Sequence, residues 1–153
     1  MLDAPPVQID VPALVRQDLA AAKRRTHVPI LLPSTAPANP DAPAVSGSGY
    51  GRRTHWAFEF AYDPNCGGAT ACFLGEVTGR QGGTPAFRKR VRLRGGRTGY
   101  YKPLSCGASC SPPEIQWVRR KVLYSIQWNE ANAGGSRRTM ISLANSAIAA
   151  GPR

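Results

Sequence analysis

Near the N-terminus, apolar residues recur at the spacing of one helix face. Leu14, Val15, Leu19 and Ala22 recur at this spacing, and Asp10 precedes them at the position of an N-cap. The basic run 23–25 follows, and cations are favourable at the negative end of the helix dipole. We therefore predict an N-terminal helix that closes at this run.

Alternation typical of strands dominates the middle of the chain. The side chains at positions 56, 58, 60 and 62 are aromatic and alternate with smaller or charged residues, which predicts a strand with one aromatic face. The apolar run 28–33 contains prolines near both ends and predicts an edge strand. Further strands are expected at 71–78, 87–93, 99–101, 114–118 and 122–128, the last two as a hairpin with a turn at Arg119-Arg120-Lys121.

Helical spacing returns at the C-terminus. Ser136 is a suitable N-cap, and Gly151-Pro152 ends the element in the usual manner. The apolar stripe between them predicts an amphipathic helix. It consists of Met140, Ile141, Leu143, Ala144, Ala147 and Ile148.

Together these elements predict an α+β fold, an antiparallel β-meander of about five or six strands with an N-terminal helix and a C-terminal helix packed on one face. A length of 153 residues fits one domain. Within it we expect an N-terminal helix and lead-in strand (1–33), a Pro/Gly/Ser-rich loop (34–51), and a disulfide-stapled sheet with the C-terminal helix (52–153).

The segment 34–51 contains one short motif. Ser46-Gly47-Ser48-Gly49-Tyr50 fits the S-G-x-x-Y signature of periplasmic lysozyme inhibitors. Such a string also arises readily in a segment rich in Gly and Ser. We therefore favour a flexible linker at this place.

The C-terminal third has a layout with parallels elsewhere. Trp117 in one strand, a tight basic turn, the strand 122–126 and a helix containing Leu143-Ala144-Asn145-Ser146 follow one another, and Leu31-Leu32-Pro33 lies near the N-terminus. This layout resembles small bacterial extracytoplasmic domains, secreted or membrane-tethered and mostly uncharacterised. The resemblance implies a sheet-plus-helix domain outside the membrane and implies no catalytic residues.

The four cysteines form two close pairs in glycine-rich turns, Cys66 with Cys72 and Cys106 with Cys110. Spacings of C-x5-C and C-x3-C do not suit a zinc ribbon, and neither histidine lies near a pair. We expect two local disulfides, with free buried thiols and a metal site as alternatives. Disulfides indicate a periplasmic or extracellular protein.

The N-terminal sequence Met1-Leu2-Asp3-Ala4-Pro5-Pro6 lacks the basic start and apolar stretch of a signal peptide. An exported protein whose leader has been removed would begin in this way, and so would a cytosolic protein. No apolar run approaches the roughly 20 residues of a transmembrane helix. We expect no transmembrane segment, and at most peripheral contact with a membrane.

The net charge of +11 is unevenly distributed. Arg88, Arg90, Arg92 and Arg94 occur at every second position, so that in a strand all four would point to one face. Arginines aligned in this way repel one another unless anions or carboxylates compensate them, and they match carboxylates and phosphates well. We predict an anion-binding face made by these four residues with Arg97 and Tyr100; a solvated face partly neutralised by Glu59 and Glu76 is the alternative.

Catalytic patterns are few. Neither His27 nor His55 accompanies a nucleophile motif, and no glycine loop suited to phosphate precedes a helix. Glu59 and Glu76 lie in strands expected to be adjacent, and paired carboxylates in a cleft could hydrolyse glycosides. We expect no cofactor and no metal, and strand glutamates of this kind commonly face solvent.

These observations lead to three hypotheses. The first is a non-catalytic cell-envelope binding module whose basic sheet face takes an anionic partner. The second is a periplasmic inhibitor or immunity protein that blocks an enzyme or toxin through loops such as 46–53 or 95–101. The third is a hydrolase acting through Glu59 and Glu76. Nucleic acid is the least favoured partner, since disulfides indicate export and no base-reading motif is present.

Overall fold

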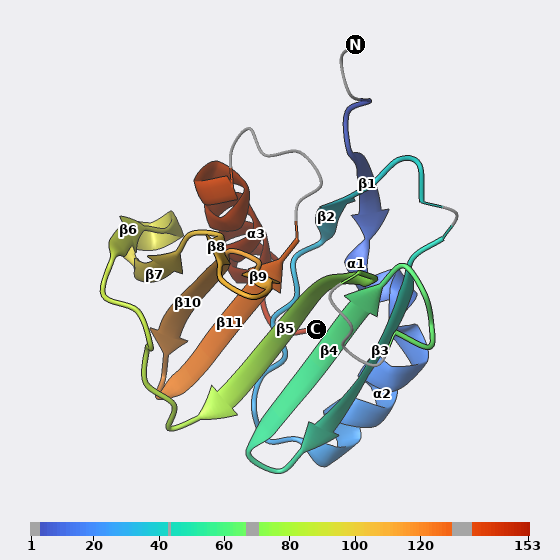
Figure 1. Cartoon of the computed structure of the whole chain (residues 1–153). Coiled ribbons are helices and arrows are strands. Elements are labelled where there is room, and N and C mark those ends of the chain that lie inside the picture. The colour runs from blue at the N-terminus through green and yellow to red at the C-terminus, as the bar shows by residue number, and fades with distance from the viewer. Residues whose placement is uncertain (1–3, 43, 67–70, 130–135) are drawn as a thin grey trace.

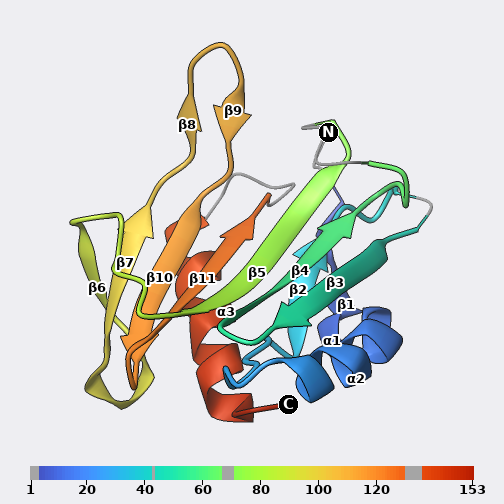
Figure 2. The same ribbon diagram turned by 90° about the horizontal axis from the view of Figure 1, so that it is seen from below.

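A seven-stranded antiparallel sheet forms the centre of the molecule, and helices cover one of its faces (Figures 1 and 2). The computed structural model describes residues 4–42, 44–66, 71–129 and 136–153. The predicted α+β class is confirmed, with an antiparallel sheet and with the N-terminal and C-terminal helices on the same side of it. Met1-Leu2-Asp3 lies outside the described residues.

The elements follow one another along the chain in mixed order. They are β1 (Val7–Asp10), α1 (Val11–Leu14), α2 (Arg16–Arg25), β2 (Thr35–Ala38), β3 (Ser46–Arg52), β4 (His55–Ala61), β5 (Phe73–Gln81), β6 (Arg90–Arg92), the 3-10 turn η1 (Arg94–Gly96), β7 (Thr98–Lys102), β8 (Ser105–Cys106), β9 (Cys110–Ser111), β10 (Glu114–Arg119), β11 (Val122–Trp128) and α3 (Ser136–Ala150).

The strand order of the main sheet is β3-β4-β5-β11-β10-β7-β6, which is not a simple meander. After β5 the chain crosses to the far edge, forms β6 and β7, and returns so that β11 lies beside β5 (Figure 2). The strand predicted over 87–93 is only Arg90–Arg92. It begins three residues later than predicted and ends one residue earlier, before Gly95 and Gly96, which have positive φ and turn the chain so that the Leu93 N–H donates to the Arg97 carbonyl.

The predicted N-terminal helix is two helices. Asp10 is the N-cap, as predicted, and its carboxylate accepts a hydrogen bond from the Ala13 N–H at 3.1 Å. At Val15 the backbone leaves the helical region, with φ −122° and ψ 22°, and this residue separates α1 from α2. Val15 and Ala22 are buried against the sheet.

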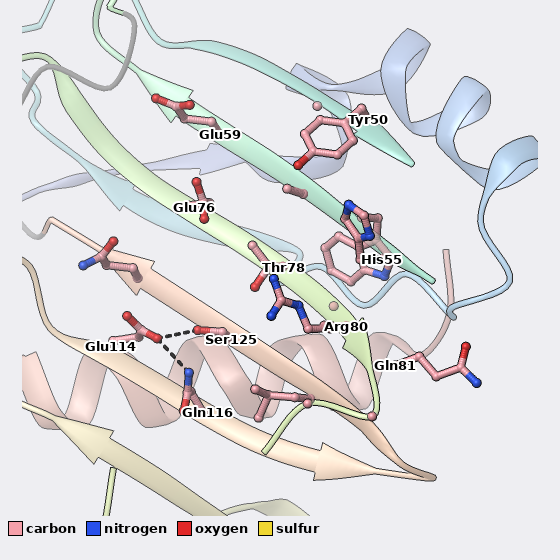
Figure 3. Close-up of a pocket in the computed structure, with 18 of the residues that line it drawn as sticks. Tyr50, His55, Glu59, Glu76, Thr78, Arg80, Gln81, Glu114, Gln116 and Ser125 are labelled. Atoms are coloured by element: carbon pink, nitrogen blue, oxygen red, sulfur yellow. Dashed lines mark hydrogen bonds between the residues drawn. The ribbon is translucent and has the colours of Figure 1, made fainter. Parts of the chain in front are cut away.

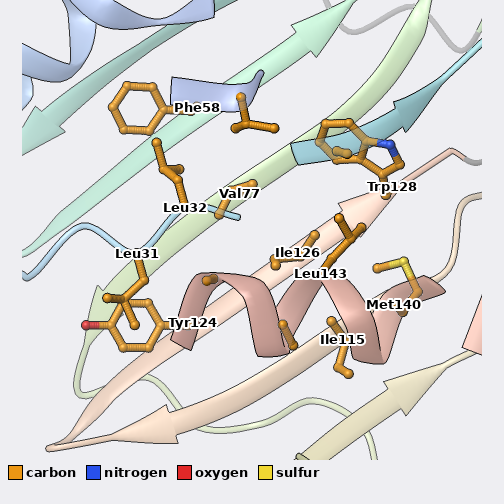
Figure 4. Close-up of a cluster of buried hydrophobic side chains, with 14 of the residues drawn as sticks. Leu31, Leu32, Phe58, Val77, Ile115, Tyr124, Ile126, Trp128, Met140 and Leu143 are labelled. Atoms are coloured by element: carbon orange, nitrogen blue, oxygen red, sulfur yellow. The ribbon is translucent and has the colours of Figure 1, made fainter. Parts of the chain in front are cut away.

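The edge strand predicted at 28–33 is wrong. This segment is an extended chain that forms no strand and runs through the core, with Ile30, Leu31 and Leu32 buried. Its apolar character reflects burial from all sides, because the sheet covers it on one side and α3 lies close by (Figure 4). In the same core, Met140 and Leu143 of α3 pack with residues of the sheet.

The prediction of a loop over the whole of 34–51 is also wrong. The segment contains β2, which pairs with β1, and β3, which forms an edge of the main sheet. The reason is visible at Gly51, where a Cβ atom would lie 2.6 Å from the Ala22 carbonyl oxygen of α2. The glycines that resemble a linker let the helix approach the strand closely, so the flexible-linker interpretation of Ser46–Tyr50 does not hold.

Two disulfides are present, Cys66–Cys72 and Cys106–Cys110, with the predicted pairing. Residues 67–70 of the first loop lie outside the described residues. The second disulfide joins β8 and β9, a hairpin that projects beyond the end of the sheet (Figure 2). Residues 103–110 of this projection are all exposed, so this disulfide holds a loop and not the core.

We predict that Gly51→Ala destabilises the protein by about 1–3 kcal/mol, because the added methyl group overpacks the contact with α2. Chemical denaturation monitored by tryptophan fluorescence measures the change. Ser48→Ala on the same strand points to the other face and is the matched control, with an expected change within about 0.5 kcal/mol. Equal effects of the two substitutions would contradict the proposed close contact.

Candidate binding surface

Among the described residues, no helix lies over one face of the main sheet (Figure 2). Tyr50 is 49% exposed and Val118 is 43% exposed on this face, whereas Trp56 and Ile126 on the helix-covered face are at 1% and 0%. Residues directly opposite one another in antiparallel strands share a face, so the register defines which side chains meet there. We call this surface the open face.

The register arranges the open face in three rows that run across the strands. The first row is rich in carboxylates, the second carries hydroxyl and amide groups, and the third begins with cations. In strand order they are Ser48, Glu59, Glu76, Gln127, Glu114 and Lys102; Tyr50, Ala57, Thr78, Ser125, Gln116, Tyr100 and Arg90; and Arg52, His55, Arg80, Leu123 and Val118.

A groove of about 890 Å³ lies over the middle of the open face. The loop that leaves β5 forms one wall of it, and the Ala86 N–H holds this loop in place by donating to Gln116 Oε1 at 2.8 Å. Figure 3 shows Glu59, Glu76 and Glu114 at one end of the groove and His55 and Arg80 at the other. The groove is therefore electrically polarised along its length.

Glu76, in the middle of the carboxylate row, is partly buried. Burial raises the pKa of Glu76 above its ordinary value, and the negative charges of Glu59 and Glu114 raise this pKa further. Glu114 accepts hydrogen bonds from Ser125 Oγ at 2.7 Å and from Gln116 Nε2 at 2.9 Å, and both contacts hold its carboxylate in place. These two contacts fix the position of the Glu114 side chain at one end of the groove.

The structure brings part of the predicted anion-binding set together. Arg90 and Arg92 lie in β6 at the sheet edge, and Arg90 is directly opposite Tyr100 on the open face. Arg88 and Arg94 lie just outside the strand, and all four of these arginines are exposed. Among the described residues, none of the four forms an ion pair with a carboxylate.

Glu59 and Glu76 do not neutralise the arginines. They are directly opposite each other in β4 and β5, and β6 lies four strand positions from β5 in the sheet order. Four spacings of the sheet amount to roughly 19 Å. The alternative of a basic face neutralised by these glutamates therefore does not fit the geometry.

Two further basic elements lie elsewhere. Arg97 is half-buried beyond η1, and its Nη1 is a buried atom without a hydrogen-bond partner in the described part of the chain. Arg119 pairs with Val122, which is buried, so it points to the helix-covered side of the sheet and away from the face of Arg90 and Arg92. The basic turn is thus separate from the arginine strip.

The structure places the two histidines apart. His55 lines the groove, where its ring meets the Tyr50 ring edge to face at 6.0 Å, and His27 follows α2 on the opposite side of the sheet. Over residues 4–42, 44–66, 71–129 and 136–153, no three His, Cys, Asp or Glu side chains are placed to hold a metal ion. In the same ranges, no helix combines the length and apolar character needed to cross a membrane.

Comparison with known proteins gives no match to a family model, a curated protein or a solved structure. The interpretation of the open face therefore depends on its own geometry.

Glu114, Ser125 and Gln116 could not be recognised from the sequence as members of one site. The sequence does show that Glu114 and Gln116, two residues apart in β10, lie on the same face of that strand, and it shows the alternation around Ser125 in β11. The missing information was the pairing of Thr78 with Ser125, which joins strands distant in the sequence. Without this pairing, the third carboxylate cannot be placed beside the first two.

We predict that Glu76→Gln stabilises the protein at neutral pH. Because the folded-state pKa is raised, the folded protein holds this proton more tightly than the unfolded chain, and stability falls as the pH rises through the folded pKa. The advantage of the variant should vanish below the ordinary value of 4.5. Thermal unfolding midpoints between about pH 3.5 and 8 measure this difference.

The control is Asp41→Asn, which removes an exposed carboxylate outside the row. This control variant measures how much the loss of any one negative charge changes the stability of a basic protein. A midpoint difference between parent and Glu76→Gln that stays constant from acid to neutral pH would contradict the desolvated state of Glu76.

Proposed function

We propose that the protein is a non-catalytic binding module of the bacterial cell envelope that takes an anionic partner on the basic edge of its open face. The observation that carries this proposal is the exposed run of Arg88, Arg90, Arg92 and Arg94, which forms no ion pair within the described part of the chain, and of which Arg90 and Arg92 lie on the open face at the edge of the sheet. The two disulfides support maturation in an oxidising compartment.

The strip is held in a defined orientation. Val91 and Leu93 are buried at 5% and 3% exposure, and they anchor the strand from the side opposite the arginines. Arg90 and Arg92 are two residues apart in a strand, a separation of roughly 6–7 Å. Guanidinium groups at this separation suit neighbouring phosphates or carboxylates, which they bind with paired hydrogen bonds.

The charge distribution of the open face supports a preferred orientation of the partner. The carboxylate row around Glu76 lies well inside the sheet, while the arginines lie at the edge. A polyanion is attracted to the edge and repelled from the groove, because complementary and like charges act in opposite directions. Tyr100 lies beside Arg90 and offers a partly buried ring next to the strip.

We predict that Arg90→Gln with Arg92→Gln lowers binding to vesicles containing phosphatidylglycerol by roughly 30-fold at low salt, since each cation at an anionic surface contributes about 1 kcal/mol. Co-sedimentation at low and high salt measures the effect. Arg24→Gln with Arg25→Gln is the matched control, because it removes the same charge from α2 on the covered side. The parent should bind little to vesicles of phosphatidylcholine alone.

Two results would count against this proposal. Equal losses in the strip variant and the α2 variant would indicate general attraction by net charge. Retention of one protein from an envelope extract, at high salt and by both parent and strip variant, would favour the inhibitor or immunity function and make the strip incidental.

A second candidate function is hydrolysis of a glycoside by Glu59 and Glu76. They line the groove and are directly opposite in the sheet, so their Cβ atoms lie about 4.5–5.5 Å apart. A retaining glycosidase needs two carboxyl groups close together, one of them with a raised pKa, and the pKa of Glu76 is raised.

If this function holds, the parent should hydrolyse an oligosaccharide, and Glu76→Gln should lower the turnover roughly a hundredfold or more. Gln127→Ala in the same row is the control for altered groove shape, and it should keep most of the turnover. A parent protein without turnover on a panel of oligosaccharides would exclude this candidate.

A further inference from the structure

A second cavity lies at the end of the molecule where the β10–β11 turn meets the segment after α2 and the end of the chain. Its volume is about 300 Å³, at the small end of the range for ligand pockets. Six of the side chains around it are largely apolar. They are Val28, Pro29, Leu31, Val122, Tyr124 and Pro152.

The remaining groups around this cavity are cationic or neutral. They are His27, Gln81, Arg119 and Arg120, and no Asp or Glu that the structure describes is among the lining residues. Arg119 lies close to Tyr124, since its positive charge opposes the increase that burial causes in the pKa of Tyr124. The cavity therefore combines an apolar interior with a positive rim.

The backbone conformation of the β10–β11 turn is one that arginine and lysine rarely adopt. Arg119 and Val122 are the last pair of the hairpin, so Arg120 and Lys121 form a two-residue turn, with φ of 50° and 65°. Left-handed backbone at both positions favours Asn-Gly, because long side chains are strained there. The Lys121 carbonyl accepts from the Gly82 N–H at 2.7 Å, which fixes the turn against its neighbour.

A strained conformation that the surroundings hold in place suggests a role for the side chains it presents. The turn places Arg120 on the rim of the cavity, while Lys121 is not among the lining residues. Asn at position 120 would fit the backbone better and would remove this cation. The presence of arginine is explained if its charge is needed at the rim.

We propose that this cavity binds a small amphipathic anion, with an apolar aromatic or aliphatic body against Val122 and Tyr124 and a carboxylate held by Arg119 and Arg120. The site is distinct from the arginine strip, because it opens on the helix-covered side of the sheet and takes a small molecule. It does not depend on the function proposed above.

The test uses benzoate as the probe, with benzyl alcohol and benzylamine as neutral and cationic compounds of similar size. Binding to the whole chain is measured by chemical-shift titration at about 0.15 M salt, where the Debye length is about 8 Å and distant charges contribute little. Benzoate should bind more tightly than either control compound, with shifts at Val122 and Tyr124.

Arg120→Asn should weaken benzoate binding roughly tenfold, the effect of losing one charge-assisted hydrogen bond. This variant should fold at least as stably as the parent, because asparagine tolerates the left-handed region. Lys121→Gly is the matched control, since it removes the same charge from the same turn and relieves strain there. It should leave the affinity for benzoate within about twofold.

The proposal is overturned if benzoate binds no better than benzyl alcohol, or if benzoate does not bind at millimolar concentration. Equal losses in Arg120→Asn and Lys121→Gly would also overturn it, because they would show a general effect of charge. Loss of benzoate binding in Arg90→Gln with Arg92→Gln, and not in Arg120→Asn, would assign the anion to the arginine strip instead.

Discussion

The arrangement of this molecule depends on hydrogen bonds from aromatic side chains of the main sheet to carbonyl groups of two segments outside that sheet, the extended chain at 28–33 and the strand β2. The Pro29 carbonyl accepts from Trp56 Nε1 and from the Tyr124 hydroxyl, both at 3.1 Å, and the Pro37 carbonyl accepts from Trp128 Nε1 at 2.8 Å. A buried carbonyl without a partner is costly, so a chain that crosses the core outside a sheet needs donors from side chains. Tryptophan and tyrosine supply such donors together with large apolar surfaces.

This constraint explains why one sheet face is covered and the other is open. The donors of Trp56, Tyr124 and Trp128 point to the side of the sheet where these two segments run, and α2 and α3 lie on the same side. Large aromatic rings on this side need space, which the sheet provides by placing glycine opposite them. A Cβ atom at Gly75 would overlap the ring of Trp128. Bulk is thus concentrated on one face, and the other face is left with polar rows and a groove.

The sequence predicted most of the elements whose signals are local. The aromatic alternation of β4, the β10–β11 hairpin and α3 could be recognised because their side-chain periods act within a few residues. The segment 28–33 was misread because an apolar run does not distinguish a strand from an extended chain buried on all sides. β3 was missed because its glycines suit both a linker and a strand that touches a helix. The carboxylate row required the pairing of β5 with β11, which no local pattern contains.

The arginines of the strip 88–94 also have a structural interpretation, since charged residues on an edge strand discourage pairing with other sheets. That role accounts for Arg90 and Arg92, which lie in β6. It does not account for Arg88 and Arg94, which lie outside the strand and offer no ladder to protect. Positive charge extends past both ends of β6. At these positions the arginines repel their neighbours, but they do not help to prevent pairing of the edge strand with another sheet. An anionic partner removes this repulsion along the whole strip, and edge protection would need only its middle.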